Sequence, residues 1–171
     1  MMGKRVFKEI AKKRDGKLVY TKLIFLKGLE IPLKDHRLLV SHKAASKDAS
    51  ASTDIECDLN DDYGFTLNVN TDNIYSQMAK SLGEKDVLIG NPVFDDVFVV
   101  NSNNEQLAKQ FLEPDLQEIL LEYKDATPGI RVGKSKFQLY ISAIVLNVDK
   151  LDKLIGLSMS LINKLVSNKN V

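Results

Sequence analysis

The sequence predicts an α+β fold in which a mainly antiparallel sheet packs against several helices. Strand-like segments gather in an N-terminal cluster, and the helices come later, around one shorter C-terminal hairpin. Polar and apolar residues alternate in 54–59 and 65–70, as in antiparallel strands with one covered face. An apolar stripe with a 3.6-residue period in 147–166 predicts a long C-terminal helix. Strands segregated from helices in this way favour an antiparallel sheet over parallel βαβ units.

Residues 1–171 are expected to form a single α+β domain, because a chain of this length buries roughly 70% of its unfolded surface in one core. A sub-division into a strand-rich half, 1–83, and a strand-helix-helix-hairpin-helix half, 84–171, is the alternative. The only cysteine, Cys57, has no intramolecular partner, which is typical of a reducing compartment. The longest apolar run near the start, 23–26, is far short of the roughly 20 residues of a membrane span. We therefore expect a soluble, cytoplasmic protein without a membrane span.

The first third of the chain contains one short helix followed by extended segments. Residues 4–13 place apolar side chains at helical spacing, and "RDGK" ends this predicted helix. Residues 17–33 are rich in β-branched and aromatic residues and are punctuated by Gly28 and Pro32. Residues 37–42 form a further predicted strand.

The middle of the chain predicts a half-buried hairpin and a helix. Ile55, Cys57 and Leu59 fall on one face of the strand 54–59, and the residues between them are acidic. After the turn "NDDYG", residues 65–70 alternate in the same way, so we expect the two strands to pair with each other. A helix over 71–82 follows, with Thr71 or Asp72 as its N-cap.

In the second half, residues 93–100 have two mainly apolar faces, as expected for a central strand that is covered on both sides. "SNNE" is a capping box that begins the next helix, with Ser102 as the N-cap and Glu105 at N3. Pro114 restarts a helix at its N1 position. Residues 129–146 predict a hairpin or two short strands before the long C-terminal helix.

Net charge is unevenly distributed along the chain. Residues 1–43 carry a net charge of +8, residues 44–127 carry −12, and residues 128–171 carry +5. Basic ends that pack beside an acidic middle explain this pattern, and an anionic surface bound by the basic N-terminal region is the alternative. We expect no nucleic-acid partner, because the lysines are scattered around the first helix and no aromatic platform lies among them.

No complete catalytic, metal or cofactor motif is present in the sequence. "GIRVGKS", residues 129–135, has three residues between its glycines instead of the four of a phosphate-binding loop, and a strand follows it instead of a helix. His36 and His42 could face the same side of one strand, but they have no third and fourth zinc ligands. Cys57 could pair with either histidine as a nucleophile, although its alternation with apolar residues predicts a buried core position. We expect no cofactor, no metal and no catalytic residue set.

The stretch "DVLIGNPVFDDVFVVNSNN", residues 86–104, holds the candidate binding residues Asp95, Asp96 and Asn91. Carboxylates and amides in this position can bind a ligand or perform acid–base chemistry. A carboxylate at this place can also accept hydrogen bonds from the backbone amides of the "IGNP" turn. The structural role is our first interpretation, and the open question is whether Asp95 faces the amides of the turn or a cleft.

Residues 86–123 resemble a pattern found in many uncharacterised bacterial proteins, a domain of unknown function. The pattern is approximately Asp-Ile-x-x-Gly-Asp/Asn-x-x-Phe-Asp-x-x-Phe-x-Val, followed by a polar turn, a helix and a leucine-x-proline restart. The matching positions are Asp86, Val87, Gly90, Asn91, Phe94, Asp95, Phe98 and Val100, and then Leu112 and Pro114. The resemblance implies a bacterial source and a shared fold, but no reaction. Asn91 occupies a position where aspartate is commoner in that family, which argues against a catalytic acid there.

The sequence therefore favours a non-catalytic binding or interaction domain whose partner is an unidentified protein or small molecule. The alternative is a hydrolase or transferase that uses carboxylates near Asp95 and Asp96, with His36 or His42 as the base. A histidine nitrogen within about 3 Å of either carboxylate is the geometry that would favour this alternative. The oligomeric state is left open.

Overall fold

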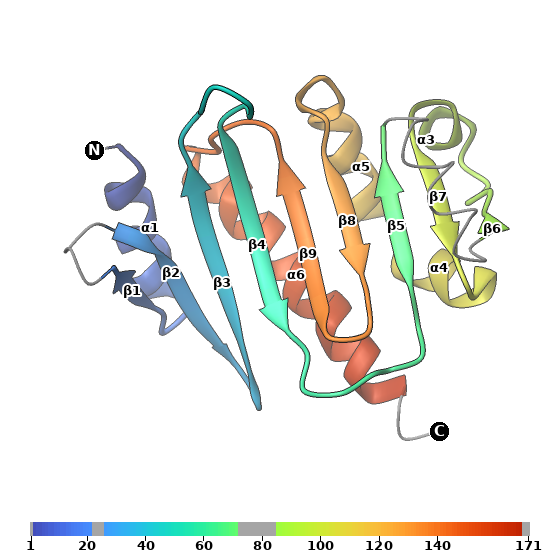
Figure 1. Cartoon of the computed structure of the whole chain (residues 1–171), viewed down its shortest axis with the longest axis horizontal. Helices are drawn as coiled ribbons and strands as arrows, with labels where there is room; N and C mark the ends of the chain where they lie inside the picture. The colour runs from blue at the N-terminus through green and yellow to red at the C-terminus, as the bar shows by residue number, and fades with distance from the viewer. Residues whose placement is uncertain (1, 22–25, 72–84, 169–171) are drawn as a thin grey trace.

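The computed structural model describes residues 2–21, 26–71 and 85–168, and its centre is one nine-stranded sheet (Figure 1). All the strand pairings are antiparallel, and the order across the sheet is β1-β2-β3-β4-β9-β8-β5-β7-β6. The strands are β1 (Lys17–Tyr20), β2 (Leu26–Leu33), β3 (His36–Lys43), β4 (Ser52–Asp58), β5 (Leu67–Asn70), β6 (Lys85–Asp86), β7 (Val99–Ser102), β8 (Gly129–Val132) and β9 (Lys136–Ile141). The predicted α+β class with an antiparallel sheet is confirmed, and the N-terminal strands and the C-terminal hairpin share this sheet.

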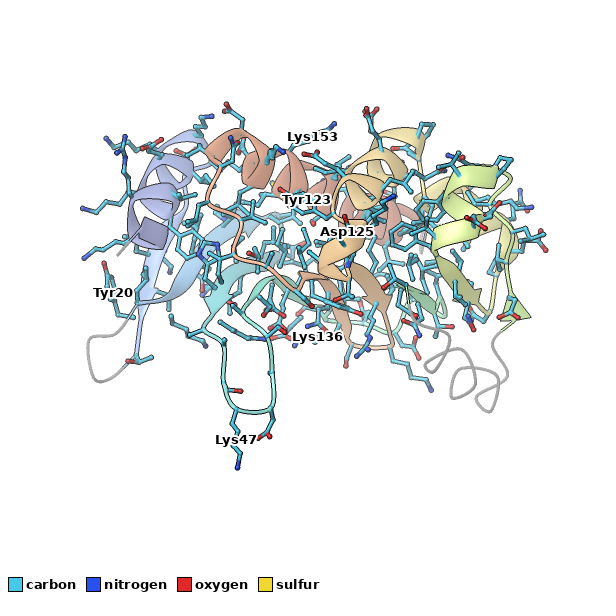
Figure 2. The ribbon with its side chains drawn as sticks, turned by 90° about the horizontal axis from the view of Figure 1, so that it is seen from above. Tyr20, Lys47, Tyr123, Asp125, Lys136 and Lys153 are labelled. Atoms are coloured by element: carbon cyan, nitrogen blue, oxygen red, sulfur yellow. The ribbon has the colours of Figure 1, made fainter. Side chains whose placement is uncertain are left out.

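The helices lie on one face of the sheet, and the loop that carries Lys47 projects from the opposite face (Figure 2). They are α1 (Met2–Lys13), α3 (Pro92–Val97), α4 (Glu105–Phe111), α5 (Pro114–Glu122) and α6 (Val148–Asn168). The predicted long C-terminal helix is confirmed, and the side chain of Asn147 caps it by accepting a hydrogen bond from the Lys150 amide at 2.9 Å. No helix in the described ranges is long and apolar enough to cross a membrane.

The apolar face of the sheet and the inner sides of the helices form the core. Alternate residues of each strand point into this layer, as in β4, where Ile55 and Cys57 are 0% and 1% exposed. Phe7 and Ile10 of α1 close one end of the core, and Phe94 stacks on Phe98 at the other, with ring centroids 4.6 Å apart.

The predicted pairing of 54–59 with 65–70 is wrong, although the alternation in both strands is right. β4 pairs with β3 and β9, and β5 pairs with β7 and β8, so the hairpin β8–β9 lies between β4 and β5. Alternation specifies which face of a strand is buried, but it does not specify the neighbouring strand. The topology also places strands from 1–83 and from 84–171 side by side within one sheet.

Two further predictions in the second half need correction. Residues 92–97 form the helix α3 instead of a covered strand, because Asn91 caps this helix and Pro92 occupies its first turn. Ser102 belongs to β7, and the N-cap of α4 is Asn104, whose side chain accepts from the Leu107 amide. The predicted helix over 71–82 falls almost wholly outside the described residues.

Several ion pairs join the acidic middle of the chain to its basic ends. Among the described residues six pairs do so: Asp54 with Lys43, Glu56 with Lys43 and with Lys136, Glu113 with Lys164, Glu118 with Lys153, and Glu122 with Lys150. Two of these pairs connect α5 to α6 on the helical face, and a third connects Glu113, the N-cap of α5, to α6. These pairs involve Lys43 from the N-terminal basic segment and four lysines from the C-terminal one. Lys13 and Arg14 pair instead with Asp149 and Asp152 of α6.

Candidate functional site

The "IGNP" turn before α3 is held by side chains of the residues around it. The two carboxylate oxygens of Asp95 accept hydrogen bonds from the backbone amides of Ile89 and Gly90, each at 2.9 Å. Gly90 has a φ of +95°, a conformation that favours glycine. The Asn91 side chain accepts from the amides of Val93 and Phe94 at the start of α3. The structure therefore directs the Asp95 carboxylate to the amides of the turn, which is the structural role that the sequence favoured.

Asp95 and Asp96 do not form a pair of acid–base groups with a histidine. Asp96 is exposed on α3, whereas Asp95 is partly buried and bonded to the turn. His36 and His42 lie on β3, which is five steps from β7 in the sheet. At about 4.8 Å per step, β3 and the strand that follows α3 are about 24 Å apart. The carboxylates and histidines of the alternative enzymatic hypothesis are thus not brought together.

Both histidines of β3 share the core-facing side of the sheet, as their spacing predicted. The His42 ring packs on Phe7 with ring centroids 4.5 Å apart. Burial lowers the pKa of His42 below 6.5, and a hydrogen bond with the backbone of Val145 opposes this effect. Within the described part of the chain, His42 Nε2 is buried without a hydrogen-bond partner.

Cys57 is buried in the same layer, next to Leu38 across the sheet. Burial, together with the charge of Asp58, raises the pKa of the Cys57 thiol to about 11. A thiol in this state is a poor nucleophile at neutral pH. Among the described residues, no group of three His, Cys, Asp or Glu side chains could hold a metal ion.

A groove of about 930 Å³ lies on the helical side of the molecule, between α6 and the connection from α4 to α5. One wall is a helical stripe of α6 with Gly156, Met159, Ser160, Asn163, Lys164 and Ser167. Residues 109–114 and Gln117 form the opposite wall, and Arg14 and Ile89 complete the lining. This volume is at the upper end of the range for ligand-binding clefts.

The predicted candidates Asn91 and Asp95 form hydrogen bonds with two residues that line the groove, Gln117 and Ile89. The Asn91 side-chain amide donates to Gln117 Oε1 at 2.7 Å, and Gln117 Nε2 donates to the Leu112 carbonyl at 2.5 Å. Gln117 is 7% exposed, so these bonds fix a buried amide at the groove wall. Asp95 fixes the backbone of Ile89, which also lines the groove. The 86–123 block therefore builds one wall of the groove, and Asp96 lies outside this network.

The lining combines hydrogen-bonding groups with smaller apolar surfaces and an excess of cations. Amide and hydroxyl side chains come from both walls, and Ile89, Pro114 and Met159 supply apolar contacts. The lining contains three cations, Arg14, Lys109 and Lys164, and one acid, Glu113. Each cation has an acidic partner: Asp152 for Arg14, Glu105 for Lys109 and Glu113 for Lys164. Such a lining can bind a polar, elongated ligand, but it contains no group poised for nucleophilic or acid–base chemistry.

The sequence interpretation missed the α6 wall and Arg14. One signal was available, because Gly156, Ser160, Asn163 and Ser167 are spaced by four, three and four residues and form a small, polar stripe beside the apolar stripe of the helix. Arg14 gave no signal, since its contacts with α6 join residues 138 and 145 positions apart in the chain.

The opposite face of the sheet carries a row of mainly polar residues across the nine described strands. The pairing places Lys17, Glu30, Leu39, Glu56, Gln138, Arg131, Asn68, Asn101 and Asp86 side by side, one from each strand. Gln138 donates to Glu56 at 3.1 Å, and Asn101 donates to Asp86 at 3.3 Å. Lys17 and Glu30 also form an ion pair. Asn101, in contrast, is 0% exposed, and its Oδ1 is buried without a hydrogen-bond partner among the described residues.

Comparisons with known proteins show a similarity of fold to a solved structure. No family model matches the sequence, and no curated protein matches it. Among solved structures, the crystal structure of the mycobacterial trehalose monomycolate transport factor A, TtfA, is similar, with a TM-score of 0.52 and 12% sequence identity. The alignment covers 98% of this chain and 95% of that chain. At this identity the likeness concerns the fold alone.

Proposed function

We propose that this chain is a non-catalytic binding domain, and that the groove between α6 and the α4–α5 connection takes an extended peptide segment of a partner protein. The observation that carries the proposal is the groove itself, with hydrogen-bonding side chains on both walls. The catalytic alternative has no comparable support, because the described carboxylates and histidines that it requires lie on separate parts of the sheet.

The dimensions of the groove suit a short stretch of extended chain. Gly156 and Ser167 are eleven residues apart on α6, which corresponds to about 16 Å at 1.5 Å per residue. An extended peptide rises about 3.3 Å per residue, so about five residues fit along this wall.

The chemistry of the lining suits a peptide backbone. A peptide presents alternating N–H donors and C=O acceptors, and side chains such as Gln110, Ser160 and Asn163 can both donate and accept. The apolar surfaces of Ile89 and Met159 can cover side chains of the ligand. A partner segment bound in this way would leave the outer face of the sheet exposed.

A cytoplasmic location remains part of the proposal. Its support is the state of Cys57, which is buried, unpaired and protonated at neutral pH, as expected for a chain that works in a reducing compartment.

Selection from a displayed library of random twelve-residue peptides tests the proposal. Ser160 is exposed and lines the groove, so Ser160→Trp fills the groove without disturbing the core. Ser50→Trp is the matched control, because Ser50 is exposed in the loop between β3 and β4. The selected peptides are then synthesised, and their dissociation constants are measured by calorimetry with the full chain and both variants.

The expected result is that peptides enriched on the unmodified chain lose at least tenfold in affinity for Ser160→Trp and keep their affinity for Ser50→Trp. Enriched peptides that bind both variants equally would place binding elsewhere and contradict the proposal. A selection that enriches no peptide would contradict it as well.

A further inference from the structure

Arg14 lies at the junction of α1, α6 and the groove. It follows the last residue of α1, and its backbone amide donates to the Ile10 carbonyl. Its guanidinium donates through Nε to the Asp152 carboxylate at 2.5 Å and through Nη2 to the Asp152 backbone carbonyl at 2.9 Å. These two bonds hold the planar group in one orientation against α6.

Gly156 gives the guanidinium the space that this orientation requires. Gly156 is one helical turn after Asp152, and a Cβ atom added there would lie 3.1 Å from Arg14 Nη2. This is tighter than ordinary van der Waals contact, so a larger residue would push the guanidinium away from α6. Glycine in the interior of a helix costs roughly 0.5–1 kcal/mol relative to alanine. The close approach of Arg14 is a physical reason for glycine at this position.

The remaining nitrogen of the guanidinium has a weak acceptor. Nη1 donates to Met159 Sδ at 3.4 Å, and Met159 lines the groove. A thioether sulfur accepts hydrogen bonds weakly, whereas a carboxylate oxygen accepts them strongly from a guanidinium. An anionic ligand in the groove would therefore gain a much better bond than the one it displaces.

Arg14 is also the least exposed cation of the groove. Its side chain is 24% exposed, compared with 34% for Lys164 and 44% for Lys109. Charge interactions are screened less where water is partly excluded. The neighbouring Asp152 compensates part of the charge and orients the guanidinium fork, and so reduces the entropy that is lost when a ligand binds.

We propose that Arg14 is the anion anchor of the groove, and that it recognises a carboxylate side chain of the bound peptide. This inference rests on the proposed function, and it narrows the partner to a segment that carries an aspartate or glutamate. In the unbound protein, Arg14 Nη1 donates to the Met159 sulfur, and the ligand carboxylate replaces this sulfur as the acceptor.

Two displayed libraries of twelve-residue peptides test this inference directly. One has glutamate fixed at its central position and the other has glutamine there, with all other positions random. We expect enrichment on the full chain from the glutamate library. When the central glutamate of a selected peptide is replaced by glutamine, the dissociation constant should rise about 10- to 100-fold.

Variants of the protein assign this preference to Arg14. With Arg14→Gln, the glutamate and glutamine forms of the peptide should bind equally, within about twofold. Arg131→Gln is the matched control, because Arg131 is an arginine on the outer face of the sheet, and it should keep the full preference. Arg14 also ties α1 to α6, so circular dichroism verifies that the variant is folded. The ratio of the dissociation constants of the two peptide forms is also measured on the unmodified chain, and this measurement is valid whether or not the variant folds.

The outcomes separate this inference from the proposed function. Equal affinity for both peptide forms on the unmodified chain, with binding still blocked by Ser160→Trp, overturns the role of Arg14 and leaves the groove as the peptide site. A preference for glutamate that persists in Arg14→Gln assigns the anion anchor to another residue and overturns the inference too. Binding that Ser160→Trp does not affect, or no enrichment from either library, overturns the proposed function itself.

Discussion

Both carboxylate oxygens of Asp95 accept hydrogen bonds from backbone amides. The amides of Ile89 and Gly90 point at it from a turn whose glycine has a positive φ. The Ile89 amide is partly buried and needs an acceptor, and a carboxylate is among the strongest available. Such a carboxylate contributes to stability and to the shape of the groove wall.

Asp95→Asn should lower the free energy of unfolding by about 1–3 kcal/mol, because a neutral amide has only one acceptor oxygen and cannot keep both charge-assisted hydrogen bonds to the turn. Asp96→Asn, at the exposed neighbouring position, should change it by less than about 0.5 kcal/mol. Urea unfolding followed by circular dichroism measures both values. Equal effects of the two substitutions would mean that the turn does not depend on Asp95.

Cys57 should resist alkylation in the folded protein. Its thiol is 1% exposed, and its pKa is raised from 9.0 to about 11, so at pH 8 almost no thiolate is present. Iodoacetamide labelling at pH 8, measured by mass spectrometry, should be slow for the native chain and fast in guanidinium chloride. The same shift means that the unfolded chain releases this proton first as pH rises from about 9 to 11, so this contribution to stability is lost over that window. Rapid labelling of the native chain would refute the buried position.

His42 should make the fold less stable in mild acid. Burial lowers its folded-state pKa below 6.5, so the unfolded chain takes up a proton first as pH falls below about 6.5. The contribution of His42 is therefore complete above pH 6.5 and is lost as pH falls through the folded-state pKa. His42→Gln should show a smaller decrease in unfolding free energy than the unmodified chain between pH 7.5 and pH 5.5. Parallel pH profiles for the two proteins would contradict this origin of the pH dependence.

At the scale of elements, local signals identified most helices and strands. The 3.6-residue period of α6, the N-cap Asn147, Pro114 as the first residue of α5, and the alternation in β4 and β5 are all visible in the sequence. The predicted strand over 93–100 rests on two mainly apolar faces, and this pattern cannot distinguish a short buried helix such as 92–97 from a covered strand. Asn91 before Pro92 was the capping signal that favoured a helix.

Strand partners could not be predicted in the same way. The order β4-β9-β8-β5 inserts a C-terminal hairpin between two strands that are consecutive in the chain. The pairing of β5 with β8 depends on the packing of the whole sheet, since its partners are more than 60 residues apart. Face alternation is equally satisfied by several strand orders.

This strand order predicts a specific pattern of amide hydrogen exchange. The amides of the central strands β4, β9 and β8 should exchange more slowly than those of β1, because each central strand has a neighbour on both sides and β1 is a short edge strand. Exchange measured by NMR at pH 7 would reveal the gradient. Protection of β1 equal to that of β9 would indicate a further partner for this edge.

At the scale of the molecule, the sheet separates two surfaces of different character. The outer face carries a row of mainly polar side chains, three neighbouring pairs of which are bonded to each other, and the helical face carries the groove. The candidate residues Asn91 and Asp95 were visible in the sequence, but their relation to the groove required the contacts of Asn91 with Gln117 and of Asp95 with the turn. The α6 wall and Arg14 come from distant parts of the chain, and only tertiary packing brings them together.

The likeness to TtfA, with 12% identity over nearly the whole of both chains, places this architecture among solved structures. Because one fold can carry many functions, the function of this chain has to be argued from its own groove.

NMR mapping of a selected peptide on the full chain tests the binding role of the groove most directly. We predict that the amides with the largest chemical-shift changes lie in 156–167, in 109–117 and at Arg14, and that Ser160→Trp abolishes these changes. Changes concentrated instead on the outer sheet face, around Gln138, Arg131 and Asn68, would contradict the account and place the binding surface on the opposite side of the molecule.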